Sequence, residues 1–562
     1  MDDAFLNLMN GFLTILQPQY LLYGAVGVLI GTFVGVLPGV GPPLTIALLL
    51  PLTYSFEPTA AFLVFGGIYF GALYGGSITS ILMNTPGESS AVVTAIEGHA
   101  MAKSGRAGVA LSISIIGAVI AGTIATLGLT FLSPVIAGIA SSLRATDYFA
   151  LMLFSFASVT ALVGKSIVRG MLSLFIGLWA GLIGIDFVSG DARFTFGIPQ
   201  LSDGINEVLV VIGLFAVGEA LYGSARAMAG GQTLVPLNGR FWPNRSEVKR
   251  VWKPWLRGSG LGFVFGALPT GGAEIPTFLS YGLERRLSKH KNEFGKGAPE
   301  GMAGPEAAAS ASFSGVMVPL LTLGIPTSAT AAILLSAFQI YNIQPGPRLF
   351  ESSGTIVWPL IASFYIGNIL LFVINLPLIR LWVKILKIPT PFLYAGILVF
   401  ATLGVYSISN SFVDLIVVYI IGIVGLLMRR YDFPIAPAIL GVILGPLMET
   451  QFRRALELGE GSFLVFVDRP FSAIVIALAI AVILLPILSR RFSRAKDVVE
   501  ENDVAALMEA TATKELDGGA DAAGQEPGAG TPVAPGAEEA EPSAPPTRSR
   551  IPFLHRNKRR DE

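Results

Sequence analysis

The sequence predicts an all-α polytopic membrane protein with about 11 to 12 spanning helices, re-entrant hairpins and two inverted repeats. Three observations support this fold class: an apolar composition, long uncharged runs, and glycine- and proline-rich breaks within some runs. Of the 562 residues, 52% are hydrophobic and 14% are charged, and the mean hydropathy is +0.67. A soluble chain would show its apolar residues as periodic stripes rather than as uninterrupted runs.

Charge and residue counts argue against several function classes. Lys plus Arg and Asp plus Glu number 38 each, so the net charge of zero gives no reason to expect a nucleic-acid partner. The chain has no cysteine, which excludes disulfides, thiolate catalysis and iron–sulfur ligation. Its three histidines, His99, His290 and His555, show no HExxH spacing, so a membrane metalloprotease is not expected. The polar N-terminus lacks the basic region of a signal peptide, so we expect the first apolar helix to remain in the mature protein.

Eleven apolar runs are expected to cross the bilayer, because a crossing helix needs about 20 residues. They lie near 59–83, 108–132, 147–163, 167–188, 207–226, 307–325, 354–378, 391–408, 410–428, 434–448 and 470–488.

The distribution of Lys and Arg predicts the orientation of these runs. Basic loops mark the cytoplasmic side of a membrane protein. All the basic loops fall on one side if four broken segments enter and leave the membrane from the same face, as re-entrant hairpins do. These segments are 20–53, 84–100, 256–284 and 326–342. The N-terminus is then expected to be periplasmic and the C-terminus cytoplasmic.

Internal similarity predicts two repeats within the chain. Segment 31–42 matches 262–273, with Gly31 and Gly35 opposite Gly262 and Gly266. Segment 75–90 resembles 315–330. The first member of this second pair is followed by Lys103 and Arg106, whereas the second is followed by a loop with a single Arg that span counting places outside. The repeats are therefore expected to be inverted.

The predicted organisation has five parts. They are an N-terminal segment 1–19, transmembrane repeat 1 at 20–226, a cytoplasmic linker at 227–255, transmembrane repeat 2 at 256–490 and a cytoplasmic tail at 497–562. The tail is rich in Ala, Gly, Pro and Glu and lacks apolar periodicity, so it is expected to be disordered.

Four breaks, at 38–43, 84–90, 269–273 and 324–328, are the candidate binding elements. Proline removes a backbone donor, and glycine permits close approach of a ligand. Such breaks persist at membrane depth only against protein or a watery cavity, where freed N–H groups can bind an anion and freed carbonyls can coordinate Na⁺. A single break would be read as an ordinary turn at a helix end. Four breaks in repeat-related pairs favour a site.

Candidate residues for binding substrate or ion come from the second and fourth breaks, which offer hydroxyl, amide and backbone groups: Asn84, Thr85, Gly87, Ser89, Ser90, Gly324, Thr327, Ser328 and Thr330. Residues expected to support the breaks are Pro38, Gly39, Gly41, Pro86, Pro269, Gly271, Gly272 and Pro326. No catalytic residue and no organic cofactor is expected, and a Na⁺ site is considered without assigned ligands.

Glu274 follows the third break and is a candidate ion or proton carrier, because a carboxylate at membrane depth is a functional-site hypothesis by default. A helix-terminus carboxylate in a polar pocket is the equal alternative. Asp147, Asp186 and Asp414 lie near the ends of runs, where solvation at the membrane surface is the simpler expectation.

Five long motifs within about 20–455 carry a resemblance to a known family. They are "VLPGVGPPLTIALLLPLT", "YGGSITSILMNTPGESSAVVTAIEGHAMAKSGRAGVAL", "SYGLERRLSKHKNEFGKGAPEGMAGPEAA", "PLLTLGIPTSATAAILL" and "FPIAPAILGVILGPLMETQFRRAL". In this order they resemble the large membrane subunit of tripartite tricarboxylate transporters, the TctA family. The resemblance implies a bacterial inner-membrane permease that takes up organic carboxylates such as citrate, driven by a Na⁺ or H⁺ gradient. It also implies a small TctB-like membrane subunit and a TctC-like periplasmic substrate-binding protein.

The chain departs from the family pattern at two motifs. The family often has Pro-Gly-x-Gly in the third break, where this chain has Pro269-Thr270-Gly271-Gly272 followed by Glu274 after one residue. The family's "EAANNA" is "EAAASA" here, so that Ala309 and Ser310 replace two amides. Both departures leave the choice of substrate or ion open.

The sequence thus predicts a secondary transporter in which the tips at 84–90 and 324–330 meet around an organic anion. The breaks contain no Arg or Lys, so a co-bound cation would offset the charge of the anion. The alternatives are an integral membrane channel, which would conduct ions without substrate, and a lipid-modifying enzyme. Such an enzyme would need a carboxylate or histidine cluster at the membrane surface, which the sequence lacks.

Overall fold

The computed structural model describes residues 2–37, 40–86, 89–162, 166–186, 189–197, 199–227, 234–237, 239–268, 272–386, 388 and 390–492. The predicted site residues Pro38, Gly39, Gly87, Pro269 and Gly271 lie outside the described residues, as do the side chain of Ser89 and the tail 497–562.

The described residues of the first half form helices, helical turns and two short strands, joined by loops. Its elements are α1 (Asp2–Ile15), α2 (Pro18–Gly35), α3 (Pro42–Thr53), α4 (Pro58–Met83), η1 (Ser89–Ala91), α5 (Val92–Met101), η2 (Ala102–Arg106), α6 (Ala107–Ala140), α7 (Ala145–Leu162), α8 (Ile167–Gly181), β1 (Gly184–Ile185), β2 (Ala192–Arg193), η3 (Pro199–Leu201), α9 (Glu207–Val211), η4 (Ile212–Val217) and α10 (Gly218–Ala227). Strands β1 and β2 pair antiparallel, with Gly184 opposite Arg193.

Only helices and helical turns are described in the second half. They are α11 (Arg245–Ala267), α12 (Glu274–Leu287), η5 (Lys291–Glu293), α13 (Pro299–Leu323), α14 (Ala329–Ile340), α15 (Leu349–Ser352), α16 (Gly354–Ile385), α17 (Thr390–Ser409), α18 (Phe412–Arg430), α19 (Ile435–Leu458), η6 (Phe463–Phe466) and α20 (Pro470–Phe492).

Eight helical segments of the described residues are long and apolar enough to cross a membrane. They are Pro18–Gly35, Pro58–Met83, Val92–Ala140, Glu207–Ala225, Pro299–Leu323, Gly354–Ile385, Phe412–Arg430 and Ile435–Leu458. Seven shorter apolar helices accompany them. The predicted fold class is confirmed: the chain is an all-α polytopic membrane protein. Four of the predicted spans correspond to helices of the shorter group, in α7, α8, α17 and α20, whereas the first arm of the predicted hairpin 20–53 is itself long enough to cross.

The predicted run 167–188 was too long. Helix α8 ends at Gly181, and the chain then turns into β1. Gly184 has a φ of +128°, which a helix does not allow. Asp186 is held there by Arg453 at 2.8 Å, so polar groups occupy the end of the predicted run.

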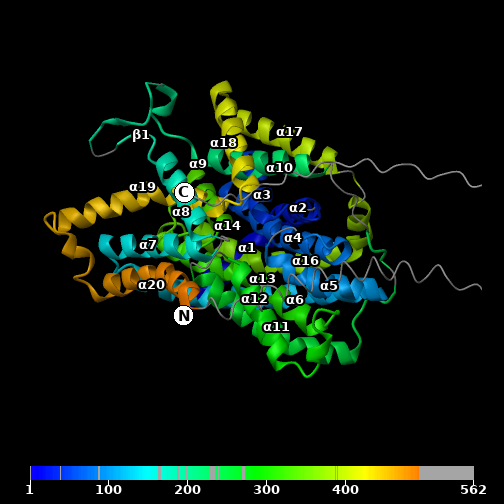
Figure 1. The fold of residues 1–562 in the computed structure, drawn as a ribbon. Coiled ribbons are helices and arrows are strands. Elements are labelled where there is room, and N and C mark those ends of the chain that lie inside the picture. Colours follow the sequence, from blue (N-terminus) through cyan, green and yellow to red (C-terminus); the bar gives the residue numbers. More distant parts are fainter. Residues whose placement is uncertain are drawn as a thin grey trace, which may run out of the picture. The chain divides into compact units, whose positions relative to one another are not determined.

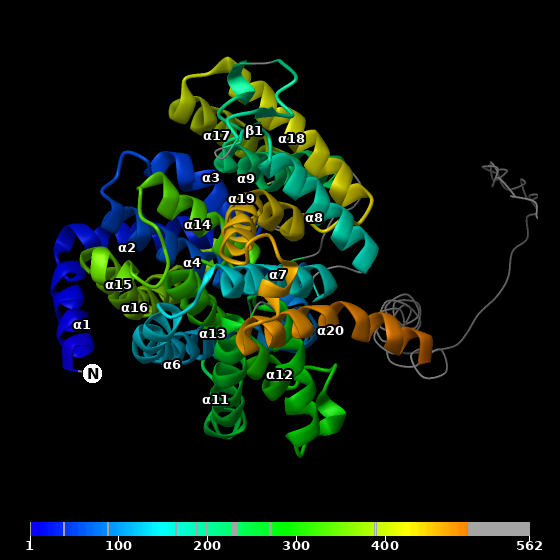
Figure 2. The ribbon, with the colours of Figure 1, turned by 90° about the vertical axis from the view of Figure 1, so that its left-hand side faces the viewer.

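Helices α4 and α13 form the interior of the helical unit. In their membrane-crossing segments 94% and 89% of the residues are buried, against 22% in α18. Both views place α4 and α13 between α11 and α12 on one side and α17 and α18 on the other (Figure 1, Figure 2). The two helices cross antiparallel: Tyr69 stacks on Phe313 with ring centroids 3.9 Å apart, while Ser77, further along α4, contacts Glu306, which precedes Phe313 on α13.

Each interior helix has a parallel partner packed against it through glycines. A Cβ atom at three glycines of α2 would come within 2.4–2.5 Å of a backbone oxygen of α4, the pairs being Gly27 with Val64, Gly31 with Ile68 and Gly35 with Ala72. Three glycines of α11 pack on α13 at 2.2–2.4 Å in the same way, the pairs being Gly258 with Gly304, Gly262 with Ala308 and Gly266 with Ser312. Small residues let two helix backbones approach this closely in a membrane. The matched glycines of 31–42 and 262–273 therefore belong to one packing arrangement that occurs twice.

The interior helices also end alike. Asn84 caps α4 with a φ of +54°, and Gly324 caps α13 with a φ of +68°. A left-handed residue commonly ends a helix, because it lets the chain turn while the last carbonyls keep partners. The second and fourth breaks both follow such a cap.

Candidate functional site

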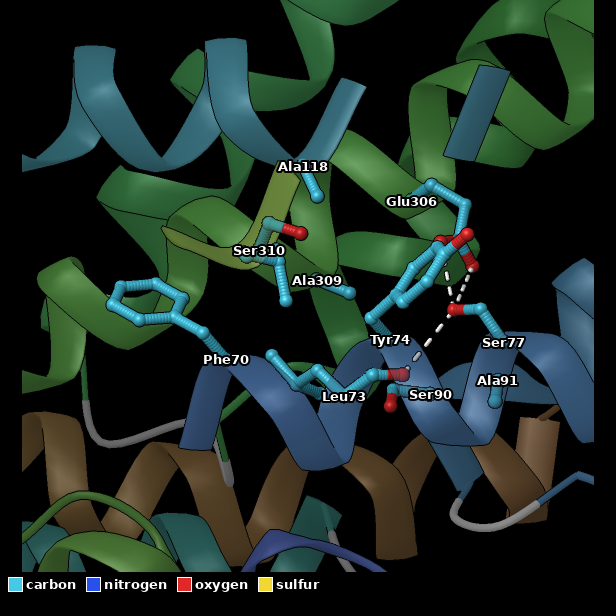
Figure 3. Close-up of a pocket in the computed structure, with 11 residues that line it drawn as sticks. Phe70, Leu73, Tyr74, Ser77, Ser90, Ala91, Ala118, Glu306, Ala309 and Ser310 are labelled. Carbon is cyan, nitrogen blue, oxygen red and sulfur yellow. Dashed lines mark hydrogen bonds between the residues drawn. The ribbon is translucent and has the colours of Figure 1, made fainter. Parts of the chain in front are cut away.

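A polar pocket lies where α4 and α13 cross, and Glu306 of α13 is its acidic residue (Figure 3). Glu306 is 5% exposed. Its carboxylate accepts hydrogen bonds from hydroxyl groups on three helices: Ser77 of α4, Thr94 of α5 and Ser114 of α6. The Ser77 Oγ lies 2.8 Å from Glu306 Oε2 and 3.1 Å from Oε1. Thr94 donates to Oε1 and Ser114 to Oε2, so both oxygens have hydroxyl donors.

Aromatic, aliphatic and hydroxyl side chains complete the lining of the pocket. The lining residues are Phe70, Leu73, Tyr74, Ser77, Ser90, Ala91, Ala118, Glu306, Ala309, Ser310 and Leu371. The free space is about 20 Å³, which is room for about one water molecule or a small ion. No basic residue is present among these described lining residues. Ala309 and Ser310, the two positions of the "EAAASA" departure, are part of the wall.

The structure brings only part of the predicted second break to this pocket. Ser90 is 3% exposed and lines it. Asn84 is exposed at the end of α4, and the Thr85 Oγ1 donates to the Met83 carbonyl at 3.1 Å. Asn84 and Thr85 therefore lie at the start of the second break, directly after α4, and are not among the residues that line the Glu306 pocket.

The described parts of the third and fourth breaks come together at the end of α11. Gly272 has a φ of +91°, and a Cβ atom there would lie 3.0 Å from the Ser328 Cβ. The Thr327 Oγ1 donates to the Gly266 carbonyl at 3.2 Å. Ser328 caps α14 by accepting from the Ala331 N–H at 3.2 Å. Ser90 thus lies at the Glu306 pocket, whereas Thr327 and Ser328 lie at the end of α11.

The other predicted residues of the four breaks that the structure describes lie at helix ends or contact neighbouring helices. Thr330 is buried in the first turn of α14. The Pro326 carbonyl accepts from Ser155 of α7 at 3.4 Å. Gly41 precedes α3 as its N-cap, and Pro86 is half-buried after the α4 cap.

Glu274 is half-buried in the first turn of α12. Its backbone carbonyl accepts from the Thr277 Oγ1 at 2.6 Å. A carboxylate at a helix N-terminus is stabilised by the helix dipole, so this position suits the helix-terminus alternative as well as an ion carrier.

Most other buried carboxylates are paired with arginine. Glu219 lies 2.5 Å from Arg429, Asp147 contacts Arg469, and Asp186 contacts Arg453. The expectation that Asp147 and Asp186 are solvated was wrong. Both side chains are buried. An arginine from a distant helix or loop balances the charge of each carboxylate, so the carboxylate does not need water around it.

Sequence reasoning noted the motif around Glu306 but did not make this residue a site candidate. The predicted span began at 307, whereas α13 begins at Pro299 and carries Glu306 two turns inside the helix. The segment before 307 is rich in Gly, Ala and Pro, so its hydropathy does not reveal a membrane helix. The feature of the sequence that could have indicated this site is Glu306 itself, an acidic residue with small residues on both sides.

Among the described residues, no group of three or more His, Asp or Glu side chains could hold a metal ion. The pocket instead offers one carboxylate surrounded by hydroxyls, which is a donor set for a hard monovalent cation or for a polar ligand.

Comparison with known proteins identifies the family. The model of the tripartite tricarboxylate transporter TctA family matches residues 21–440. The chain belongs to this family. An uncharacterized 52.8 kDa protein in the TAR-I ttuC' 3' region of Agrobacterium vitis is 42% identical over 503 residues, which cover 89% of this chain and 100% of that protein. An uncharacterized protein in the TAR-II ttuC' 3' region of the same organism is 42% identical over 242 residues, or 43% of this chain and 100% of that protein. No solved structure matches.

Proposed function

We propose that this chain is the large permease subunit of a secondary transporter that imports an organic carboxylate and is driven by a cation gradient. Membership of the TctA family supports the role of large subunit in a tripartite system. The observation that carries the proposal is the hydroxyl-lined Glu306 pocket at the crossing of the two interior helices.

The packing of the helices supports an inverted-repeat transporter. The α2–α4 and α11–α13 pairs have the same glycine packing, and α4 crosses α13 antiparallel. Transporters of this kind place their sites near the midplane, between the repeats, and move one part against the other. The location of the Glu306 pocket between α4 and α13 supports a site of this kind.

The electrostatics of the pocket favour co-transport with a cation. A carboxylate substrate that entered beside Glu306 would meet another negative charge, and the described lining residues supply no basic side chain to offset it. Burying unpaired like charges at membrane depth is costly. A cation carried with the substrate removes that cost, and the coupling ion is Na⁺ or H⁺.

The proposed partners and location come from the family. A small TctB-like membrane subunit would complete the membrane part, and a TctC-like periplasmic protein would deliver the carboxylate. We place the chain in the bacterial inner membrane, with a periplasmic N-terminus and a cytoplasmic C-terminus, because this orientation puts the basic loops inside.

Uptake into liposomes tests the proposal. The chain is reconstituted with a TctB-like small subunit and a TctC-like binding protein from the same organism. Radiolabelled citrate and other carboxylates are offered with an inward Na⁺ gradient, an inward H⁺ gradient or neither. We expect saturable uptake that requires the binding protein and one of the gradients. Uptake insensitive to both gradients would refute the coupling, and ion conductance without substrate would indicate a channel.

A further inference from the structure

We propose that Glu306, with the hydroxyls of Ser77, Thr94, Ser114 and Tyr74, forms a binding site for one sodium ion. The inference rests on the proposed function, since this ion would be the coupling cation. It assigns ligands that the sequence alone left open.

The surroundings of Glu306 leave its charge unbalanced. Within the described part of the chain, four hydrogen bonds reach the carboxylate, all from the neutral hydroxyls of Ser77, Thr94 and Ser114. By contrast, Glu219 has an arginine beside it, and Glu97 accepts from three backbone N–H groups. An ionised carboxylate at membrane depth needs a neighbouring positive charge or fixed N–H donors such as these, and the described residues that line the pocket include no basic side chain.

The hydroxyl groups can act as cation ligands as well as donors. A serine or threonine oxygen carries two lone pairs, and its hydrogen rotates to suit its surroundings. The Ser77 Oγ already lies 3.3 Å from the Leu73 carbonyl, to which its hydrogen can turn. Ser114 and Thr94 are helical residues, for which the carbonyl one turn earlier is the usual second acceptor. The oxygens then face the pocket with their lone pairs.

The Tyr74 hydroxyl points to a ligand independently of the hydrogen bonds around Glu306. Its hydroxyl is buried, and no hydrogen-bond partner is found for it among the described residues. Figure 3 shows the Tyr74 ring beside the Glu306 carboxylate, within the same pocket. Nearly all buried polar groups have a partner, so an unpaired hydroxyl that lines a polar pocket points to a missing ligand.

The size and charge of the pocket favour a monovalent ion. One carboxylate neutralises one positive charge. The free space of about 20 Å³ does not admit the several waters that Mg²⁺ keeps, and Ca²⁺ takes six to eight oxygen ligands, usually from several carboxylates. Sodium is a hard cation, and the donor atoms here are all oxygens.

The proposed sodium site would connect α5, the helix that follows the second break, to the interior helix α13. Thr94 lies on α5, which follows Ser90 and η1, whereas Glu306 lies on α13. A bound ion would therefore hold the second break against α13 and set the position of Ser90 in the wall.

Thermal unfolding of the purified full chain in detergent tests the site. NaCl replaces choline chloride at constant ionic strength, and the unfolding midpoint is recorded at each Na⁺ concentration. A ligand that binds only the folded chain raises the midpoint with its concentration. We expect a Na⁺-specific rise in the wild type and none in Glu306→Gln. Ser114→Ala and Tyr74→Phe should raise the half-maximal NaCl concentration by about tenfold.

Two variants outside the pocket are the matched controls. Glu207→Gln removes a half-buried carboxylate that accepts a hydrogen bond from the Ser336 hydroxyl at 3.3 Å, and Ser133→Ala removes a buried hydroxyl of α6. Both should keep the Na⁺-specific rise of the wild type.

Several results would overturn the assignment. They are a wild type without a Na⁺-specific rise, a Glu306→Gln variant that keeps it, and stabilisation by acid rather than by Na⁺ that Glu306→Gln abolishes, which would make Glu306 a proton carrier. If Glu306→Gln does not fold, the Tyr74→Phe and Ser114→Ala titrations decide. No substrate or partner is present, so failure of carboxylate uptake would refute the proposed function without changing this measurement.

Discussion

Glu97 and Glu306 are buried carboxylates on neighbouring helices with different surroundings. Glu97 accepts from the backbone N–H groups of Gly295, Gly297 and Ala298 at 2.6, 2.9 and 2.8 Å, and from the Tyr281 hydroxyl at 2.9 Å. Backbone donors are fixed in place, so Glu97 anchors the loop before α13 permanently. The hydroxyls around Glu306 can rotate, so their shell can adapt to a ligand.

Glu97→Ala is therefore expected to destabilise the fold. The substitution leaves three N–H groups without their acceptor, those of Gly297 and Ala298 in buried positions, at about 1–3 kcal/mol for each one that water does not reach. Tyr281→Phe removes one donor and should cost only about 1 kcal/mol. Thermal unfolding of the two variants in detergent would show the difference, and an Ala variant as stable as the Phe variant would contradict the anchoring role.

Asn84 tests the role of the second break in transport. Asn84→Ala should weaken uptake while leaving membrane insertion intact, because it removes an amide at the mouth of the break. Alanine at a φ of +54° is also strained, by about 1 kcal/mol or more, whereas glycine is not. Asn84→Gly therefore separates the two effects. Equal loss of uptake in both variants would support the amide, and normal uptake in the Gly variant would reduce Asn84 to a backbone cap.

At the scale of elements, the two glycine-packed pairs build the interior. Helix α4 packs on α2 and also on α16 and α5, and α13 packs on α11 and also on α6 and α12, so both interior helices are covered on most sides. The neighbouring glycines of α11 are not equivalent: Gly262 lies against the Ala308 backbone, whereas a Cβ atom at Gly260 would meet nothing within 4 Å.

Gly262→Ala and Gly260→Ala form a matched pair on one helix. At Gly262 the added Cβ would lie 2.2 Å from the Ala308 oxygen, so α11 must move away from α13 at a cost of about 1–3 kcal/mol. At Gly260 the same change should be neutral or stabilise the helix by up to about 1 kcal/mol. The unfolding midpoints and the folded yields measure both. A Gly262→Ala variant as stable as Gly260→Ala would refute the close packing.

On the scale of the whole molecule, the inverted arrangement predicts which side of the membrane each loop faces. If the repeats are inverted, the loop at 101–106 faces the cytoplasm, and its counterpart at 341–353 faces the periplasm. The basic residues Lys103 and Arg106 favour the first placement by the positive-inside rule.

Single cysteines decide the orientation, because the natural chain contains none. Ser104 and Ser352 are exposed, one in each loop. In intact cells, a membrane-impermeant maleimide should label Ser352→Cys but not Ser104→Cys, and permeabilised cells should show labelling of both. Labelling of both in intact cells, or of Ser104→Cys alone, would contradict the inverted arrangement.

The sequence by itself determined the helical membrane class, the family motifs and most helix positions, because uninterrupted apolar runs and glycine–proline breaks are local signals. The matched glycines were also visible, although their packing partners on α4 and α13 were not. Only the tertiary structure decided which polar groups meet. Glu306 accepts hydrogen bonds from Ser77, Thr94 and Ser114 on three other helices, and Asp147 forms an ion pair with Arg469, which lies more than 300 residues further along the chain. Contacts between residues so distant in sequence depend on how helices cross, and no local pattern of residues encodes that crossing.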